Sequence, residues 1–138
     1  MNLAGNDSLR SIDLSWNNFR GRSAIDLING LKVHLLCLLL KNNLEGFFKE
    51  NAHLISCNLE MNGFGPNVGQ ALADSIKQNT TLEELNISGN RLNTVAAFTI
   101  AQALAVNETL QVFKVRRIKL ISSLNENLFF RLDSRKSN

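Results

Sequence analysis

A sequence repeat with a period of 28 restricts the fold of this chain more than any other feature. Leu54, Leu82 and Leu110 mark this period, and each is followed by apolar residues at the third, fifth and tenth positions. Asparagine occupies the eighth position after the first two of these leucines, as Asn62 and Asn90. A fixed period of this length is typical of proteins that stack copies of one supersecondary unit. The sequence therefore predicts a repeat protein.

The N-terminal part of the chain follows the same pattern. Leu9 precedes Ile12, Leu14, Asn17 and Phe19 at the same offsets, so the copies share L-x-x-L-x-L-x-x-N-x-L with substitutions among apolar residues. The repeat also explains the composition, because 23 of the 138 residues are leucine and 19 are asparagine. With 44% apolar and 20% charged residues, the chain is in the globular range, and its length favours one domain.

The first half of each repeat predicts a strand and a tight turn. Apolar residues at the third and fifth positions alternate with other residues, as a short strand with one buried face requires. An asparagine just after such a strand can bond to neighbouring backbone groups and hold the turn. Asn17, Asn62 and Asn90 are therefore predicted to form a structural ladder along the stacked repeats.

The second half of each repeat predicts a helix. Apolar residues at helical spacing follow two of the strands, and they are Val68, Ala71, Leu72 and Ile76, then Ala97, Ile100, Ala101 and Leu104. Pro66 stands where a first helical residue is expected, and its missing N–H is tolerated there. Asn93 is the matching N-cap residue of the next helix.

These motifs resemble one class of repeat protein. The segments Asp13-Leu-Ser-Trp-Asn17, Asn62-Gly-Phe-Gly65 and Leu82-Glu-Glu-Leu-Asn-Ile-Ser-Gly-Asn90 are similar to the ribonuclease-inhibitor-like leucine-rich repeats. Over residues 1–34 and 54–115 the chain looks most like the leucine-rich-repeat-containing protein 74 group. The resemblance implies an α/β leucine-rich-repeat solenoid, with parallel strands on the concave face and helices on the convex face. It also implies a protein that binds other proteins.

Residues 1–115 are predicted to form the leucine-rich-repeat domain, with an incomplete first repeat. Leu3-Ala-Gly-Asn-Asp-Ser-Leu9 matches the helix-end motif Leu104-Ala-Val-Asn-Glu-Thr-Leu110, so the chain starts at the end of a helix. Because a natural solenoid needs a polar terminal cap, we expect a fragment or an alternative product of a longer array.

The segment from Leu9 to Leu54 departs from the period. The numbering advances by 45 between these two leucines, whereas two periods of 28 would give 56, which is a deficit of 11. We interpret residues 35–53 as a damaged repeat, with Leu35–Leu40 as its shortened strand and Leu40–Asn51 as its helix. A single longer helix through this region is the alternative.

Residues 116–138 are predicted to be a basic C-terminal tail or a capping helix. The repeat pattern stops after Val115, and helical spacing continues at Ile121, Leu124, Leu128 and Leu132. The formal net charge of +3 arises here, because residues 114–138 hold seven basic and two acidic residues. We do not expect this tail to contact nucleic acid or a membrane, because short basic runs such as Arg116, Arg117 and Lys119 are more often simply solvated.

The binding surface is predicted from strand alternation, because residues between the buried ones face outward. Together with the resemblance, this rule gives a protein-binding set on the concave face: Asp13, Ser15, Asn58, Glu60, Glu84, Asn86 and Ser88. Trp16 and its equivalent Met61 are placed on the rim of this surface. Tryptophan is frequent among interface hot spots, although packing of Trp16 over the neighbouring repeat is the alternative.

No catalytic, cofactor or metal site is predicted. The sequence has no phosphate-binding loop and no nucleophile motif, and Cys57 is expected to be a buried apolar filler. His34 and His53 have no Cys or carboxylate at metal-ligand spacing. We therefore predict a non-enzymatic interaction scaffold; the resemblance implies an enzyme regulator, either an inhibitor or a GTPase activator, as the alternative. The absence of a secretory signal favours a cytoplasmic location.

Overall fold

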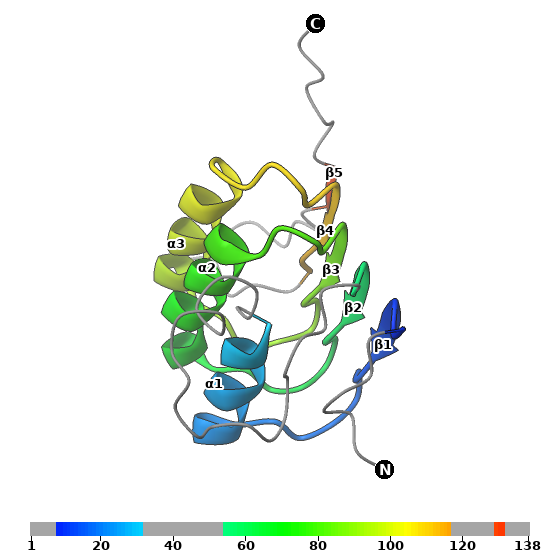
Figure 1. The fold of residues 1–138 in the computed structure, drawn as a ribbon. Coiled ribbons are helices and arrows are strands. Elements are labelled where there is room, and N and C mark those ends of the chain that lie inside the picture. The colour runs from blue at the N-terminus through cyan, green and yellow to red at the C-terminus, as the bar shows by residue number, and fades with distance from the viewer. Residues whose placement is uncertain (1–7, 32–53, 117–128, 132–138) are drawn as a thin grey trace, which may run out of the picture.

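The computed structural model describes residues 8–31, 54–116 and 129–131, which form one sheet with helices along one side (Figure 1). The strands are β1 (Ser11–Asp13), β2 (Ser56–Asn58), β3 (Glu84–Asn86), β4 (Val112–Lys114) and β5 (Phe129–Arg131). The helices are α1 (Gly21–Gly30), α2 (Gly69–Gln78), which follows the 3-10 turn η1 (Pro66–Val68), and α3 (Thr94–Leu104). Each of the first three strands is followed by a helix.

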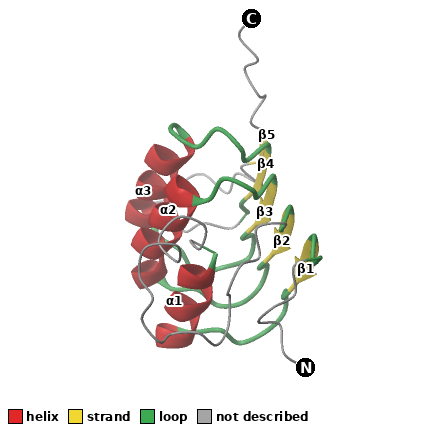
Figure 2. Ribbon diagram, in the orientation of Figure 1, coloured by secondary structure: helices red, strands yellow, loops and turns green. Residues whose placement is uncertain are grey.

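Strands β1 to β4 are parallel and lie in the order of the sequence. The helices lie side by side in a second layer against one face of the sheet, with α2 between α1 and α3 (Figure 2). This arrangement of repeated strands and helices fits the α/β leucine-rich-repeat fold that the sequence predicts. The other face of β1 to β4 carries no helix among the described residues.

Strands β1 and β2 are direct neighbours, although the connection between them is longer than one repeat. Ser11 pairs with Ser56 in the same register that joins Ser56 to Glu84. The residue number rises by 45 between paired residues of β1 and β2, but by 28 between those of β2 and β3. The first repeat is therefore 17 residues longer than the second. The damaged repeat predicted for residues 35–53, with its strand at Leu35–Leu40, falls within this longer connection. Residues 32–53 themselves lie outside the described part of the chain.

The helices follow the same offset as the strands. The side-chain amide of Asn107 donates to the carbonyl of Ile76, near the end of α2, at 2.6 Å. The side-chain amide of Asn79 donates to the carbonyl of Leu31, at the end of α1, at 2.9 Å. Leu31 and Ile76 are therefore equivalent positions, and their residue numbers differ by 45. Paired residues of β1 and β2 differ by the same amount, so α1 lies next to α2 as β1 lies next to β2. The excess residues therefore lie between the end of α1 and the start of β2.

The core lies between the sheet and the helices. Its most deeply buried apolar side chains come from strands, turns and helices, and they include Phe64, Phe113, Ile28, Leu59, Leu72, Leu85, Ile87, Leu92 and Val68. Cys57 is 2% exposed and fills part of this core, as predicted. The predicted helix starts are also confirmed, because Pro66 begins η1 and the side chain of Asn93 accepts from the N–H of Ala96 at 2.9 Å.

The helices α2 and α3 are in close contact at Gly69. A Cβ atom built on this glycine would lie 2.8 Å from the Cα of Ala96 and would also meet its Cβ. Backbone atoms cannot give way as a flexible side chain can, so the approach requires a residue without a side chain.

The predicted buried face of α3 is only partly correct. Ile100 is buried, but Ala101 is exposed, and the buried alanines of this helix are Ala96 and Ala103. In α2 the position equivalent to Ala101 is Ala73, which is fully buried. Because α3 covers that side of α2, whereas no described helix lies beyond α3, Ala101 stays exposed.

Strand β5 runs antiparallel to β4 and extends the sheet at its edge. Phe113 pairs with Phe130 in this register. For residues 129–131 the prediction of a capping helix is wrong, because extended backbone here bonds to β4 and covers an edge that would otherwise expose unpaired N–H and C=O groups. Residues 117–128 and 132–138 lie outside the described residues.

Candidate protein-binding face

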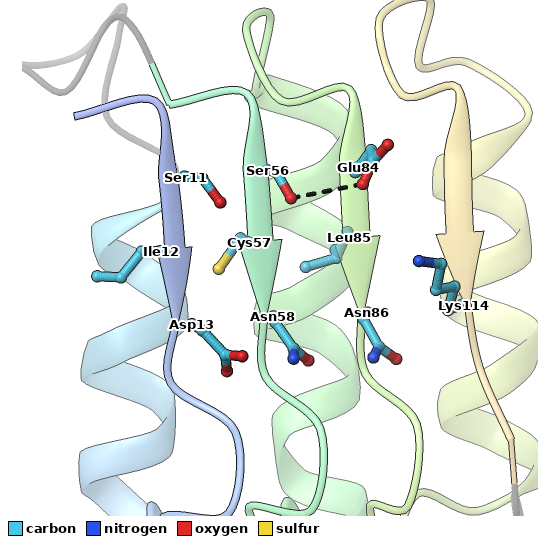
Figure 3. A pocket seen from close by; sticks show the side chains of 10 residues that line it. All are labelled: Ser11, Ile12, Asp13, Ser56, Cys57, Asn58, Glu84, Leu85, Asn86 and Lys114. Carbon is cyan, nitrogen blue, oxygen red and sulfur yellow. Dashed lines mark hydrogen bonds between the residues drawn. The ribbon is translucent and has the colours of Figure 1, made fainter. Parts of the chain in front are cut away.

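The face of the sheet away from the helices, which we call the strand face, carries a hollow of about 230 Å³ (Figure 3). Its lining consists of Ser11, Ile12, Asp13, Ser56, Cys57, Asn58, Glu84, Leu85, Asn86 and Lys114. Four residues of the predicted binding set, Asp13, Asn58, Glu84 and Asn86, come together here. That set left out Ser11, Ser56 and Lys114, although strand alternation places them on the same face.

One row of register partners crosses the four parallel strands, and its members are Asp13, Asn58, Asn86 and Lys114. The first three end their strands in the same way, since each side-chain oxygen accepts from the backbone N–H two residues later. The donors are Ser15 at 2.8 Å, Glu60 at 3.1 Å and Ser88 at 3.1 Å. These Asx turns fix the side chains in line along the sheet, as Figure 3 shows.

Further hydrogen bonds link side chains of neighbouring strands. The hydroxyl of Ser56 donates to a carboxylate oxygen of Glu84 at 3.5 Å, and the amide of Asn86 donates to a carboxylate oxygen of Glu60 at 3.2 Å. Glu60 and Ser15, both in the predicted set, lie just past their strands and are half-buried. The polar surface is thus partly ordered before any partner is present.

Charges of opposite sign lie on different strands of this face. Asp13 on β1 and Glu84 on β3 are exposed carboxylates, while β4 carries Lys114 and is followed by the exposed Arg116. The hydroxyl and the backbone N–H of Ser15 lower the pKa of Asp13 from its ordinary value of 3.8, so this carboxylate stays ionised at neutral pH. The register places Asp13 three strands away from Lys114, so these two charges do not pair with each other.

The rim residues share an unusual backbone conformation. Trp16 and Met61 both have a φ of 57°, and Gly89, the next member of this column, has a φ of 68°. Trp16 is 74% exposed, so the alternative in which it packs over the neighbouring repeat is wrong. The Met61 side chain does lie over the next repeat, because a Cβ on Gly89 would collide with its sulfur. A bulky residue at positive φ is strained, and at Trp16 little packing offsets that strain.

Ser88 corrects the predicted binding set, because it is only 4% exposed. Its carbonyl accepts from the N–H of Met61 at 2.9 Å and from the side-chain amide of Asn90 at 3.4 Å. The turn after β3 is thus bonded to the neighbouring turn that carries Met61. Ser88 is not available to a partner in this conformation.

The predicted asparagine ladder joins backbone groups of neighbouring repeats. The amide of Asn62 donates to the carbonyl of Leu14 at 2.8 Å, and the amide of Asn90 donates to the carbonyl of Leu59 at 3.0 Å. Asn17, which is exposed, donates to Leu14 within its own turn at 2.9 Å. The side-chain oxygen of Asn62 is buried and has no hydrogen-bond partner among the described residues. The step from β1 to β2 therefore lacks bonds that the next step has.

Cys57 lies behind the strand face, on the inward side of β2. Burial, and to a lesser extent the charge of Asp13, raise the pKa of its thiol to about 12, so the thiol is protonated and unreactive at neutral pH. In residues 8–31, 54–116 and 129–131, no three His, Cys, Asp or Glu side chains form a group suited to a metal ion. No helix in that same part has the length and apolar character needed to cross a membrane.

Comparison with known proteins supports the interpretation of the repeats. The family model described as Leucine Rich repeat matches residues 2–27 and 78–101. These two matches include β1 with most of α1, and β3 with most of α3. No curated protein matches the chain significantly. Leucine-rich-repeat domains generally mediate contacts between proteins and are typically non-catalytic. The matched segments and the sheet register together fit an α/β leucine-rich-repeat fold.

Proposed function

We propose that this chain is a non-catalytic module that binds another protein through its strand face. The row of side chains from Asp13 to Lys114 carries this proposal, because Asx turns hold its polar groups in line within a surface hollow. A curved array of parallel strands is the surface that repeat proteins of this kind use for binding. The proposal includes a solenoid of the ribonuclease-inhibitor-like type, with the strand face as its concave side.

Trp16 supports the same proposal from a different direction. It exposes 74% of its surface and adopts a φ of 57°, which stabilises neither the core nor the local backbone. Exposed aromatic side chains beside a polar surface are frequent anchors of protein interfaces. We therefore place the partner over the hollow and over the Trp16 end of β1.

Capture of partners from a cell lysate tests the proposal. A variant with Asp13→Lys, Glu84→Lys and Trp16→Ala should lose the proteins that the unchanged chain captures. A matched variant with Asp26→Lys, Glu108→Lys and Phe98→Ala changes the same charges and one exposed aromatic residue away from the strand face. This matched variant should still capture the proteins that the unchanged chain captures. Equal capture by both variants would show that the strand face is not the binding surface.

Regulation of an enzyme is the alternative that the resemblance implies, and it would use the same face. It stays a prediction, as does a cytoplasmic location. The two functions differ in what the captured partner is, so identifying that partner and measuring its turnover with and without the chain separates them.

A further inference from the structure

We infer that the strand face recognises an extended peptide segment that crosses the strands, with a basic side chain over β1 and an acidic side chain over β4. This inference rests on the proposed function and specifies the chemistry of the partner. Its basis is the distribution of charge and amide groups along one row of the sheet.

The two ends of that row carry opposite charges. Asp13 lies at the β1 end. Its carboxylate is exposed to solvent, and its pKa is lowered, so it carries a negative charge at neutral pH. Lys114 lies at the β4 end, and Arg116 adds a second basic group beyond it. Because three strand spacings separate Asp13 from Lys114, these two charges do not pair with each other, and each can pair with a charge of a partner. A partner of one sign would be repelled at one end.

The separation of the ends limits the spacing of the partner's charges. Three strand spacings separate β1 from β4, which at about 4.8 Å each gives a distance of roughly 14 Å. An extended chain advances about 3.3 to 3.5 Å per residue, so roughly four residues cover this distance. In such a chain the side chains of residues i and i+4 point to the same side. The matching segment therefore has a basic residue and an acidic residue four positions apart.

The middle of the row defines the residue between them. Asn58 and Asn86 use their side-chain oxygens for Asx turns, so their amide groups are the donors of this row, and the Asn58 amide also bonds to the Asp13 carboxylate. The amide of Asn86 donates one hydrogen to Glu60, and an amide has two. Residue i+2 of the segment faces these amides, so a side chain that accepts hydrogen bonds is expected there. The pattern is base-x-acceptor-x-acid, in either chain direction.

Selection from a phage-displayed library of random peptides tests this pattern, with the purified full chain as bait. Selected peptides should be enriched in a basic and an acidic residue four positions apart. Their affinity, measured by fluorescence anisotropy on synthetic copies, should fall roughly tenfold for Lys114→Glu. Lys77→Glu makes the same charge change at an exposed position of α2 and should leave the affinity unchanged. Selection against Lys114→Glu should instead enrich two basic residues at that spacing.

The outcomes separate this inference from the proposed function. If peptides are selected that depend on Trp16 and Glu84 but show no charge pattern, the strand face binds proteins and the charge inference is wrong. If no peptide is selected while capture of partners depends on the strand face, recognition of an extended segment is wrong. Loss of both peptide selection and lysate capture would overturn the proposed function as well.

Discussion

The side-chain oxygen of Asn90 accepts a hydrogen bond of 3.1 Å from the backbone N–H of Asn62, which occupies the same column one repeat earlier. The same oxygen accepts from the N–H of Phe64 at 3.0 Å, and the amide of Asn90 donates to the carbonyls of Leu59 and Ile87. One buried side chain therefore satisfies backbone groups of two successive repeats.

Replacing Asn90 by alanine should lower the free energy of unfolding by about 3 kcal/mol, because several buried backbone groups lose their partners at once. The matched change Asn17→Ala removes the equivalent side chain from an exposed turn and should cost less than about 1 kcal/mol. Urea denaturation followed by circular dichroism measures both. Similar losses for the two variants would mean that the ladder does not depend on burial.

Gly69→Ala should destabilise the chain by roughly 1–3 kcal/mol, because the new Cβ would collide with Ala96 of the neighbouring helix. Helix propensity alone predicts the opposite sign, since alanine is favoured over glycine by about 1 kcal/mol. Thermal denaturation decides between them. Adding Ala96→Gly should recover part of the loss, whereas the two changes would simply add if the helices were not in contact here.

The positive φ of Trp16 predicts a difference between two small replacements. Trp16→Gly and Trp16→Ala both remove the exposed indole, but only glycine adopts this backbone conformation without strain. The glycine variant should therefore be more stable than the alanine variant by about 1 kcal/mol. Chemical denaturation of the pair measures this difference. An alanine variant of equal stability would argue against a left-handed residue at this position.

Cys57 should report on the opening of the central strands. Its pKa is raised to about 12 and the side chain is buried, so a thiol reagent should react with it only when the sheet opens. The measurement uses Cys37→Ser, which leaves Cys57 as the single thiol. Reaction should be slow in buffer and fast in denaturant. Fast labelling of the folded chain would place Cys57 on an accessible surface instead.

Deleting residues 34–50 removes the excess by which the first repeat step exceeds the second. The shortened chain joins Val33 to Asn51, so that Asn51-Ala-His-Leu54 follows α1 as Asn79-Thr-Thr-Leu82 follows α2. Closing the shorter connection should raise the free energy of unfolding by about 1 kcal/mol, and the variant should fold. Far-ultraviolet circular dichroism and urea denaturation test this. Loss of cooperative unfolding would mean that the deleted residues contribute to the sheet or its helices.

Repeat columns in the sequence predict the inward residues and the helix starts well, because both depend on local spacing. Cys57 and Leu85 are buried at the offsets that the pattern requires, and Asn93 caps its helix. The pattern does not distinguish two shortened repeats between Leu9 and Leu54 from one repeat with an insertion. The apolar run Leu35–Leu40 has the composition of a strand, so it favoured a damaged repeat over a single longer helix.

The remaining differences depend on what covers each residue. Ser88 has an outward position in its column but is only 4% exposed, and its carbonyl bonds to the N–H of Met61 in the neighbouring turn. Ala101 has an inward position, but no described helix covers that side of α3. Neither neighbour is visible in the local sequence. The candidate binding face was therefore predictable as a set of columns, whereas the exposure of each member was not.

The antiparallel direction of β5 limits how the sheet can grow. Repeats of this kind add strands in one direction, and each new strand bonds to the edge that the previous one leaves open. Phe130 occupies that edge by pairing with Phe113. A further parallel repeat, whether from another molecule or from a lengthened gene, would first have to displace it. The reversed strand thus ends the parallel register at β4, because the edge beyond it belongs to a strand of the opposite direction.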